Sequence, residues 1–207
     1  MRYLGLVFSL LLTGCQSNTT AEVTPRQSLM AEVASFQQEL QDVRQHYLQL
    51  LDSKKQLVAH GQWEPQHLHL HIQQQRTYLE QTIQRYQVSL SKLEHRGPEL
   101  FDNWRTQLPD ALSSNTQGID PNLAYIHSHA RFDSTVSSAH YADATLQELL
   151  SRLKNSEQYL ERNPNPRAAS EVVKQTERLE RATYRAVTAL EQVEKATQAY
   201  LELEQAS

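Results

Sequence analysis

The chain has 207 residues, a formal net charge of −4 and a single cysteine, and 39% of its residues are hydrophobic. A net acidic chain lacks the basic surface that nucleic-acid binding requires, so no nucleic-acid partner is expected. One cysteine excludes an internal disulfide and any zinc site built from several thiolates.

The first fifteen residues predict export rather than a folded element. Arg2 is followed by an apolar run over residues 3–12, which is too short to span a bilayer. The run ends in Leu12-Thr13-Gly14-Cys15, which places small residues directly before the only cysteine. This segment resembles the signal peptide and lipobox of bacterial lipoproteins. The alternative is an ordinary cleaved secretory signal in which the cysteine has no role.

The resemblance implies a membrane anchor. Residues 1–14 would be removed, the sulfur of Cys15 would carry a diacylglycerol, and the new amino terminus would be acylated, for example with palmitate. Inner-membrane lipoproteins of Gram-negative bacteria commonly have Asp after the lipidated cysteine, whereas Gln16 follows it here. The resemblance therefore implies an outer-membrane lipoprotein that faces the periplasm. No motif in the mature part assigns it to a specific family.

Beyond the anchor, residues 15–26 predict a flexible tether and residues 27–207 a helical domain. The tether sequence is polar, contains Pro25 and lacks periodicity. Glycine and proline then concentrate in four gaps, at 61–65, 97–98, 109–121 and 164–166. The segments between the gaps are rich in Leu, Ala, Gln, Glu and Arg, which are strong helix formers.

Apolar residues recur along these segments at alternating steps of four and three, the period of a coiled coil. The first seam comprises Leu29, Val33, Phe36, Leu40, Val43, Tyr47, Leu50 and Leu57, with Lys54 as its polar position. The second comprises Leu68, Ile72, Leu79, Ile83, Tyr86, Leu90 and Leu93. The third comprises Val136, Ala139, Asp143, Leu146, Leu150, Leu153, Glu157 and Leu160. The fourth comprises Val172, Thr176, Leu179, Thr183, Ala186, Leu190, Val193, Thr197 and Tyr200.

These patterns predict an all-α fold, an elongated antiparallel bundle of about four long helices and one short one with coiled-coil seams. No segment alternates at period two, so no sheet is expected. Gly97 is expected to end a helix, and Pro98 to begin the short one, which extends to Leu108. Asn165-Pro166 and Asp120-Pro121 are expected to cap the helices that follow them. The sequence leaves open whether the seams close within one chain or between chains.

Two tryptophans, Trp63 and Trp104, are candidates for partner contacts, because tryptophan is enriched at binding hot spots. Packing at an end of the bundle is the competing interpretation. The loop over residues 109–121, between the two halves of the bundle, is where a partner contact is expected.

Histidines are the only candidates for a metal or ligand site. His67 and His71 are four residues apart, which places them on one face of a helix, and His127, His129 and His140 form a second group. A bound metal normally needs three or four protein ligands, so exposed histidines without a ligand are the competing interpretation. The catalytic and nucleotide-binding motifs of known enzyme classes are missing, and neither enzymatic activity nor a cofactor is expected.

The sequence therefore favours a membrane-anchored, non-enzymatic lipoprotein that acts as a structural, scaffold or accessory subunit of a cell-envelope assembly. Its expected partners are the membrane, through the acyl anchor, and either an envelope protein or a second copy of the chain. The alternative is a lipoprotein that binds a small ligand or a metal through the histidines near the interhelical loops.

Overall fold

The computed structural model describes residues 24–59, 64–108 and 121–206. Its helices are α1 (Pro25–Ala59), α2 (Pro65–Thr106), α3 (Pro121–Arg162), α4 (Pro166–Lys174) and α5 (Thr176–Ala206). No strand occurs in these ranges, and the helices pack against one another, which confirms the all-α bundle. Cys15, Trp63 and most of the loop at 109–121 lie outside the described residues.

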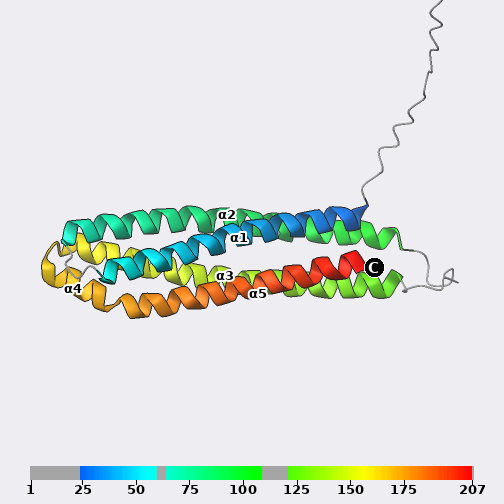
Figure 1. The fold of residues 1–207 in the computed structure, drawn as a ribbon. Helices are drawn as coiled ribbons and strands as arrows, with labels where there is room; N and C mark the ends of the chain where they lie inside the picture. Colours follow the sequence, from blue (N-terminus) through cyan, green and yellow to red (C-terminus); the bar gives the residue numbers. More distant parts are fainter. Residues whose placement is uncertain (1–23, 60–63, 109–120, 207) are drawn as a thin grey trace, which may run out of the picture.

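The four long helices form a closed ring. Helix α1 packs against α2 and α5, and α3 packs against the same two neighbours (Figure 1). The helices alternate in direction, as an up-down bundle does. Helices α2 and α3 have 42 residues each, so the bundle is about 60 Å long. The predicted seams therefore meet one another within a single chain.

The two ends of the bundle differ in the helices that meet there. At the N-terminal end, α1 and α3 begin and α2 and α5 finish (Figure 1). At the α4 end, α2 begins, α3 finishes, and α4 leads into α5. We call these the N-terminal end and the α4 end of the bundle.

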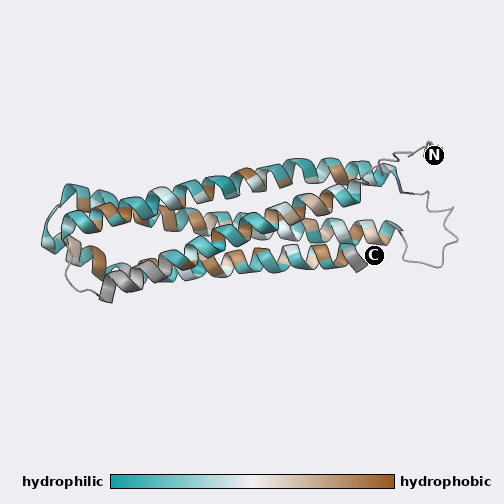
Figure 2. Ribbon diagram, turned by 45° about the horizontal axis from the view of Figure 1, so that its top comes forward, coloured by the Kyte–Doolittle hydropathy of each residue, from teal (hydrophilic) through white to brown (hydrophobic). Residues whose placement is uncertain are grey.

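The predicted seams supply most of the core. The seam residues of α1 from Leu29 to Tyr47 are at most 1% exposed, and all those of α2 are buried. Figure 2 shows hydrophobic residues interspersed with hydrophilic ones along the long helices, as expected for helices that bury one face. Asp143 and Glu157, the charged seam positions of α3, are only partly buried. The seams therefore predict the buried face, with charges confined to its margin.

Threonine occupies several fully buried positions without leaving an unpaired hydroxyl. The side chains of Thr135, Thr183 and Thr197 donate hydrogen bonds to backbone carbonyls four residues earlier, at 2.8–3.1 Å. These bonds satisfy the hydroxyl group inside the helix itself. These threonines can therefore be buried without a polar partner on another helix.

Helix α1 begins at the end of the predicted tether. Backbone N–H of Thr24 donates to the side chain of Gln27 at 3.0 Å, and backbone N–H of Gln27 donates to Oγ1 of Thr24 at 3.2 Å. This is a reciprocal capping box, with Pro25 at the first helical position where its missing N–H costs nothing. Assigning residues 25–26 to the tether was therefore wrong, because Pro25 starts a helix rather than interrupting one.

The prediction that Gly97 ends a helix was also wrong. Helix α2 continues through Gly97 and Pro98 to Thr106, so the short helix at Pro98–Leu108 does not exist as a separate element. A Cβ atom added at Gly97 would overlap the ring of Phe132 on α3. Gly97 is therefore a packing residue where α2 and α3 approach closely. The next residue, Pro98, has no N–H group, so α2 lacks one backbone hydrogen bond at this point.

The short helix is instead α4. Its cap matches the prediction, since Oδ1 of Asn165 accepts a hydrogen bond from backbone N–H of Ala168 at 2.9 Å and Pro166 follows the cap. The helix predicted to run on from there divides at Gln175, where ψ is −3°. The carbonyl of Gln175 then accepts bonds from backbone N–H of Arg178 and Leu179, which starts α5.

Candidate functional site

An aromatic cluster fills the N-terminal end of the bundle. Trp104 stacks on Phe101 with 6.0 Å between ring centroids and meets Tyr125 edge-on at 5.5 Å. Phe101 is 1% exposed and also contacts Phe132 at 5.3 Å. Trp104 is thus a packing residue that retains partial exposure. The other partner-contact candidate, Trp63, lies outside the described residues.

The first turn of α1 is joined to the last turns of α5 at this same end. Nε of Arg26 lies 2.5 Å from Oε2 of Glu204, and its Nη2 donates to the backbone carbonyl of Glu204 at 2.8 Å. The guanidinium also lies over the ring of Trp104, 5.8 Å from the centroid. The Glu204 carboxylate is buried, so Arg26 supplies the countercharge that its burial requires.

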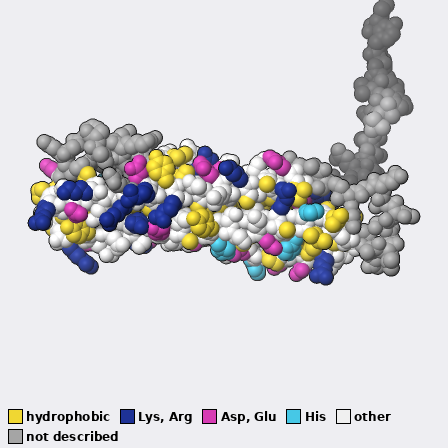
Figure 3. Space-filling view, turned by 90° about the horizontal axis from the view of Figure 1, so that it is seen from below, with side chains coloured by type: hydrophobic (Ala, Val, Ile, Leu, Met, Phe, Trp, Pro, Cys, Tyr) yellow, Lys and Arg dark blue, Asp and Glu magenta, His cyan; other side chains and the backbone are white. Residues whose placement is uncertain are grey.

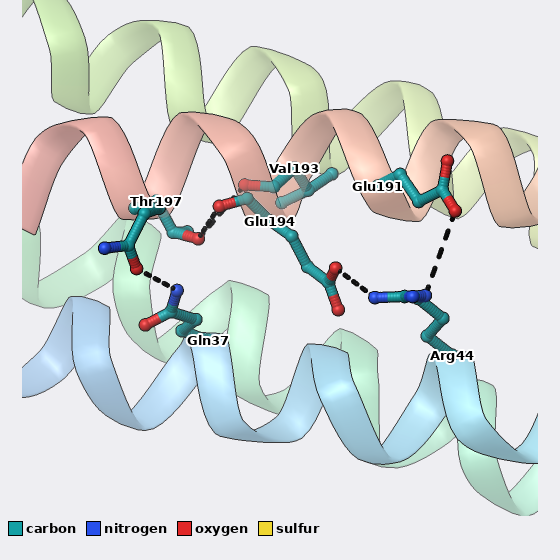
Figure 4. Close-up of polar contacts among 7 residues, drawn as sticks. Gln37, Arg44, Glu191, Val193, Glu194 and Thr197 are labelled. Carbon is teal, nitrogen blue, oxygen red and sulfur yellow. Dashed lines mark hydrogen bonds and ion pairs between the residues drawn. The ribbon is translucent and has the colours of Figure 1, made fainter.

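Polar side chains also join α1 to α5 further along the bundle. Nη1 of Arg44 donates to Oε2 of Glu194 at 2.6 Å, and its Nε lies 4.0 Å from Glu191 (Figure 4). Gln37 donates to Gln198 at 3.0 Å. These groups sit at the partly exposed margin between the helices, where ion pairs contribute little to stability. They fix the alignment of the two helices rather than form a reactive site.

The first histidine pair does not form a ligand set. His67 is largely exposed and lies 3.6 Å from Glu64, whereas His71 is partly buried. Burial lowers the pKa of His71, and its Nε2 has no hydrogen-bond partner. The two therefore occupy different environments although they lie on the same helix.

The second histidine group lies at the opposite end of the bundle from the first. His127 is exposed, and Nδ1 of His129 lies 3.1 Å from Oδ2 of Asp133, while the His129 ring packs 4.6 Å from that of Phe101. Nε2 of His140 contacts Glu94 on α2. In the part of the chain that the structure describes, no three His, Cys, Asp or Glu side chains lie close enough to hold a metal. The fold thus does not unite the two histidine groups.

The structure reveals a pocket of about 460 Å³ that the sequence analysis missed, lined by Arg152, Arg178, Arg181, Tyr184 and Arg185. It is called the arginine pocket below. Arg152 comes from α3 and the other four residues from the first turns of α5. On the face of the bundle drawn in Figure 3, Lys and Arg side chains gather toward the α4 end, whereas His side chains gather toward the other end.

A single carboxylate orients two of the four guanidinium groups. Oε1 of Glu148 accepts hydrogen bonds from Nη2 of Arg152 at 2.8 Å and from Nη2 of Arg185 at 3.0 Å. The bond from Arg152, with the nearby charge of Arg185, holds the pKa of Glu148 below its usual value. No side chain that the structure describes forms an ion pair with Arg178 or Arg181, and the side chain of Glu177, four residues before Arg181, lies outside the described part. The pocket is therefore positive, and part of its donor set is fixed in place.

One sequence signal could have found this pocket. Arg178, Arg181 and Arg185 are spaced by three and four residues, which aligns them along one face of a helix. The contribution of Arg152 could not be seen in the same way, because it depends on how α3 packs against α5.

Within the described residues, no helix has an apolar stretch long enough to cross a membrane. No curated protein and no solved structure matches the chain. A family model does match, over residues 17–203, which covers the predicted tether and almost the whole bundle. The chain therefore belongs to the family described as "Protein of unknown function (DUF2959)".

Proposed function

We propose that the protein is a lipid-anchored, non-enzymatic spacer or scaffold of the bacterial cell envelope, attached to the outer membrane through Cys15 and facing the periplasm. The observation that carries the proposal is that α1, the helix nearest to Cys15 along the chain, begins at one end of the bundle. Helix α1 begins at Pro25, ten residues after Cys15, and does so at one end of the bundle. Acyl chains on Cys15 would therefore attach the rod by its end.

The contacts at the N-terminal end suit this attachment. Arg26, in the first turn after the tether, bonds to Glu204 and lies over Trp104, so α1 is joined directly to α5 and α2. A pull on the tether would be shared among three helices rather than unwinding α1 alone. With a length of about 60 Å, the bundle would carry its α4 end well away from the lipid surface.

Fractionation of cells tests the anchor. The Cys15→Ser variant is expected to lose its membrane association, because it has no sulfur to which a diacylglycerol can be joined. Wild type and a Ser17→Ala control are expected to sediment with the outer membrane. A Cys15→Ser chain that is matured and sediments as wild type does would refute the anchor.

Crosslinking in intact cells tests the scaffold role. The wild-type chain is expected to be recovered with at least one other envelope protein or with a second copy of itself. The Cys15→Ser variant is expected to lose these products, because it no longer lies beside the membrane. Recovery of wild type without any crosslinked product, under several growth conditions, would argue against a scaffold.

A further inference from the structure

The arginine pocket concentrates positive charge that the described chain neutralises only in part. Four guanidinium groups line it, and Glu148 is the one described carboxylate within hydrogen-bonding distance of them. Placing like charges side by side costs free energy unless a counter-anion is present. The cluster is not part of the hydrophobic core, since Arg152 is only partly buried and the other residues that line the pocket are exposed.

The arrangement suits an anion with more than one charged oxygen. Glu148 holds Arg152 and Arg185, and a guanidinium so fixed presents its remaining N–H groups in a set direction. Arg178 and Arg181 add two further donor forks from α5, and Tyr184, which is 51% exposed, contributes a ring at the same opening. One carboxylate ligand would neutralise a single charge, whereas a phosphate group carries two and offers three oxygens to separate guanidinium groups.

We propose that the arginine pocket is a binding site for a phosphate-bearing anion. The guanidinium groups of Arg178 and Arg181 contact the phosphate oxygens directly, and Glu148 acts as a positioning residue for Arg152 and Arg185. The volume of about 460 Å³ accommodates a phosphate group together with a small attached moiety. This proposal does not depend on acylation of Cys15, since the pocket is formed by α3 and α5 alone.

Binding is tested with the full chain, purified in a nonionic detergent and titrated calorimetrically with pyrophosphate. Saturable binding is expected, with no comparable heat from chloride at equal ionic strength. The Arg178→Met/Arg181→Met variant is expected to bind about tenfold more weakly or worse, because it loses two charge-assisted contacts. An Arg105→Met/Arg162→Met variant removes the same charge from exposed positions outside the pocket and is expected to bind as wild type does. Equal weakening in both variants would overturn the site.

Glu148→Gln gives an independent variant. It frees Arg152 and Arg185 from their carboxylate and is expected to change pyrophosphate affinity severalfold. Glu161→Gln, an exposed position on the same helix, makes the same change in charge and is expected to leave affinity unaltered. An identical response of the two variants would show that only overall charge matters and would contradict a built pocket.

The source of the phosphate is identified by comparing soluble probes. Glycerol 3-phosphate and pyrophosphate represent free phosphates, and short-chain phosphatidic acid represents a lipid with a terminal phosphate, with short-chain phosphatidylcholine as its control of zero net charge. Tighter binding of the free phosphates supports a soluble ligand, and tighter binding of phosphatidic acid supports a membrane lipid. Failure of all of these probes to bind above the chloride background would overturn the proposal.

Discussion

The N-terminal end and the α4 end of the bundle differ in how far their side chains are buried. At the N-terminal end, packed aromatic rings and the pair of Arg26 with the buried Glu204 fill the space between all four long helices. Toward the α4 end, arginines gather around an open pocket, and one helix is divided at Gln175. The first arrangement excludes water, and the second leaves charged donors exposed to it.

This difference indicates where stability and recognition lie in the molecule. Among single side chains, closely packed and buried aromatic rings contribute most to the free energy of unfolding. Exposed or partly exposed ion pairs contribute little. We therefore expect substitutions at the N-terminal end to destabilise the bundle strongly, and substitutions in the arginine pocket to change binding with little effect on stability.

Phe101→Ala should have the largest effect. Phe101 is 1% exposed and contacts Trp104, Tyr125 and Phe132, so its removal leaves a cavity. The free energy of unfolding should fall by about 3–5 kcal/mol, measured by chemical denaturation. Tyr141→Ala, at a ring that is 58% exposed, should change it by about 0.5 kcal/mol or less. Comparable losses in the two variants would contradict the assigned core.

Gly97→Ala comes next, and its sign is informative. Helix propensity alone would stabilise α2 by about 1 kcal/mol. The added Cβ instead meets the Phe132 ring, so a net destabilisation of about 1–3 kcal/mol is expected in urea unfolding. Adding Phe132→Leu should make the same Gly97→Ala change less costly. A stabilising Gly97→Ala substitution would show that α2 and α3 do not cross closely here.

Arg26→Met should have an intermediate effect. It leaves the buried Glu204 carboxylate without its countercharge, but Arg26 itself is 28% exposed and solvent can partly compensate. A loss of about 1–2 kcal/mol is expected in thermal or chemical unfolding. Arg105→Met, on an exposed side chain at the same end, is the control. A neutral Arg26→Met substitution would mean that the pair does not hold α1 to α5.

Glu148→Gln should have the smallest effect on stability, and that effect should depend on pH. The pKa of Glu148 lies below its usual value in the folded chain because Arg152 donates to it. Its contribution is therefore fully present above the unfolded pKa, near 4.5, and is lost as pH falls through the folded pKa. Denaturation should show wild type slightly more stable than Glu148→Gln at pH 7, with the difference vanishing in acid. A difference that grows in acid would contradict the Arg152 contact.

Much of the fold could be predicted from the sequence because it depends on local periodicity. The seam from Leu29 to Tyr47 is buried as predicted, and the cap at Asn165 forms as predicted. The error at Gly97 arose because a distant residue decides the outcome. Gly97 looks like a helix terminator in sequence, but Phe132 on another helix makes it a packing residue.

The candidate site was less accessible to sequence analysis. The histidines that the sequence singled out are divided between the two ends of the bundle. The arginine pocket joins Arg152 to residues 26 or more positions later in the chain, through the packing of α3 against α5. No helical periodicity relates residues at that separation, so only the tertiary structure brings them together.

We propose that acyl chains on Cys15 attach the rod to its membrane. Mass spectrometry of the N-terminal peptide from the mature, membrane-extracted protein detects these chains. We expect a peptide that begins at Cys15 and carries the added mass of a diacylglycerol and an amide-linked fatty acid. A mature N-terminal peptide with an unmodified Cys15 thiol would refute the anchor.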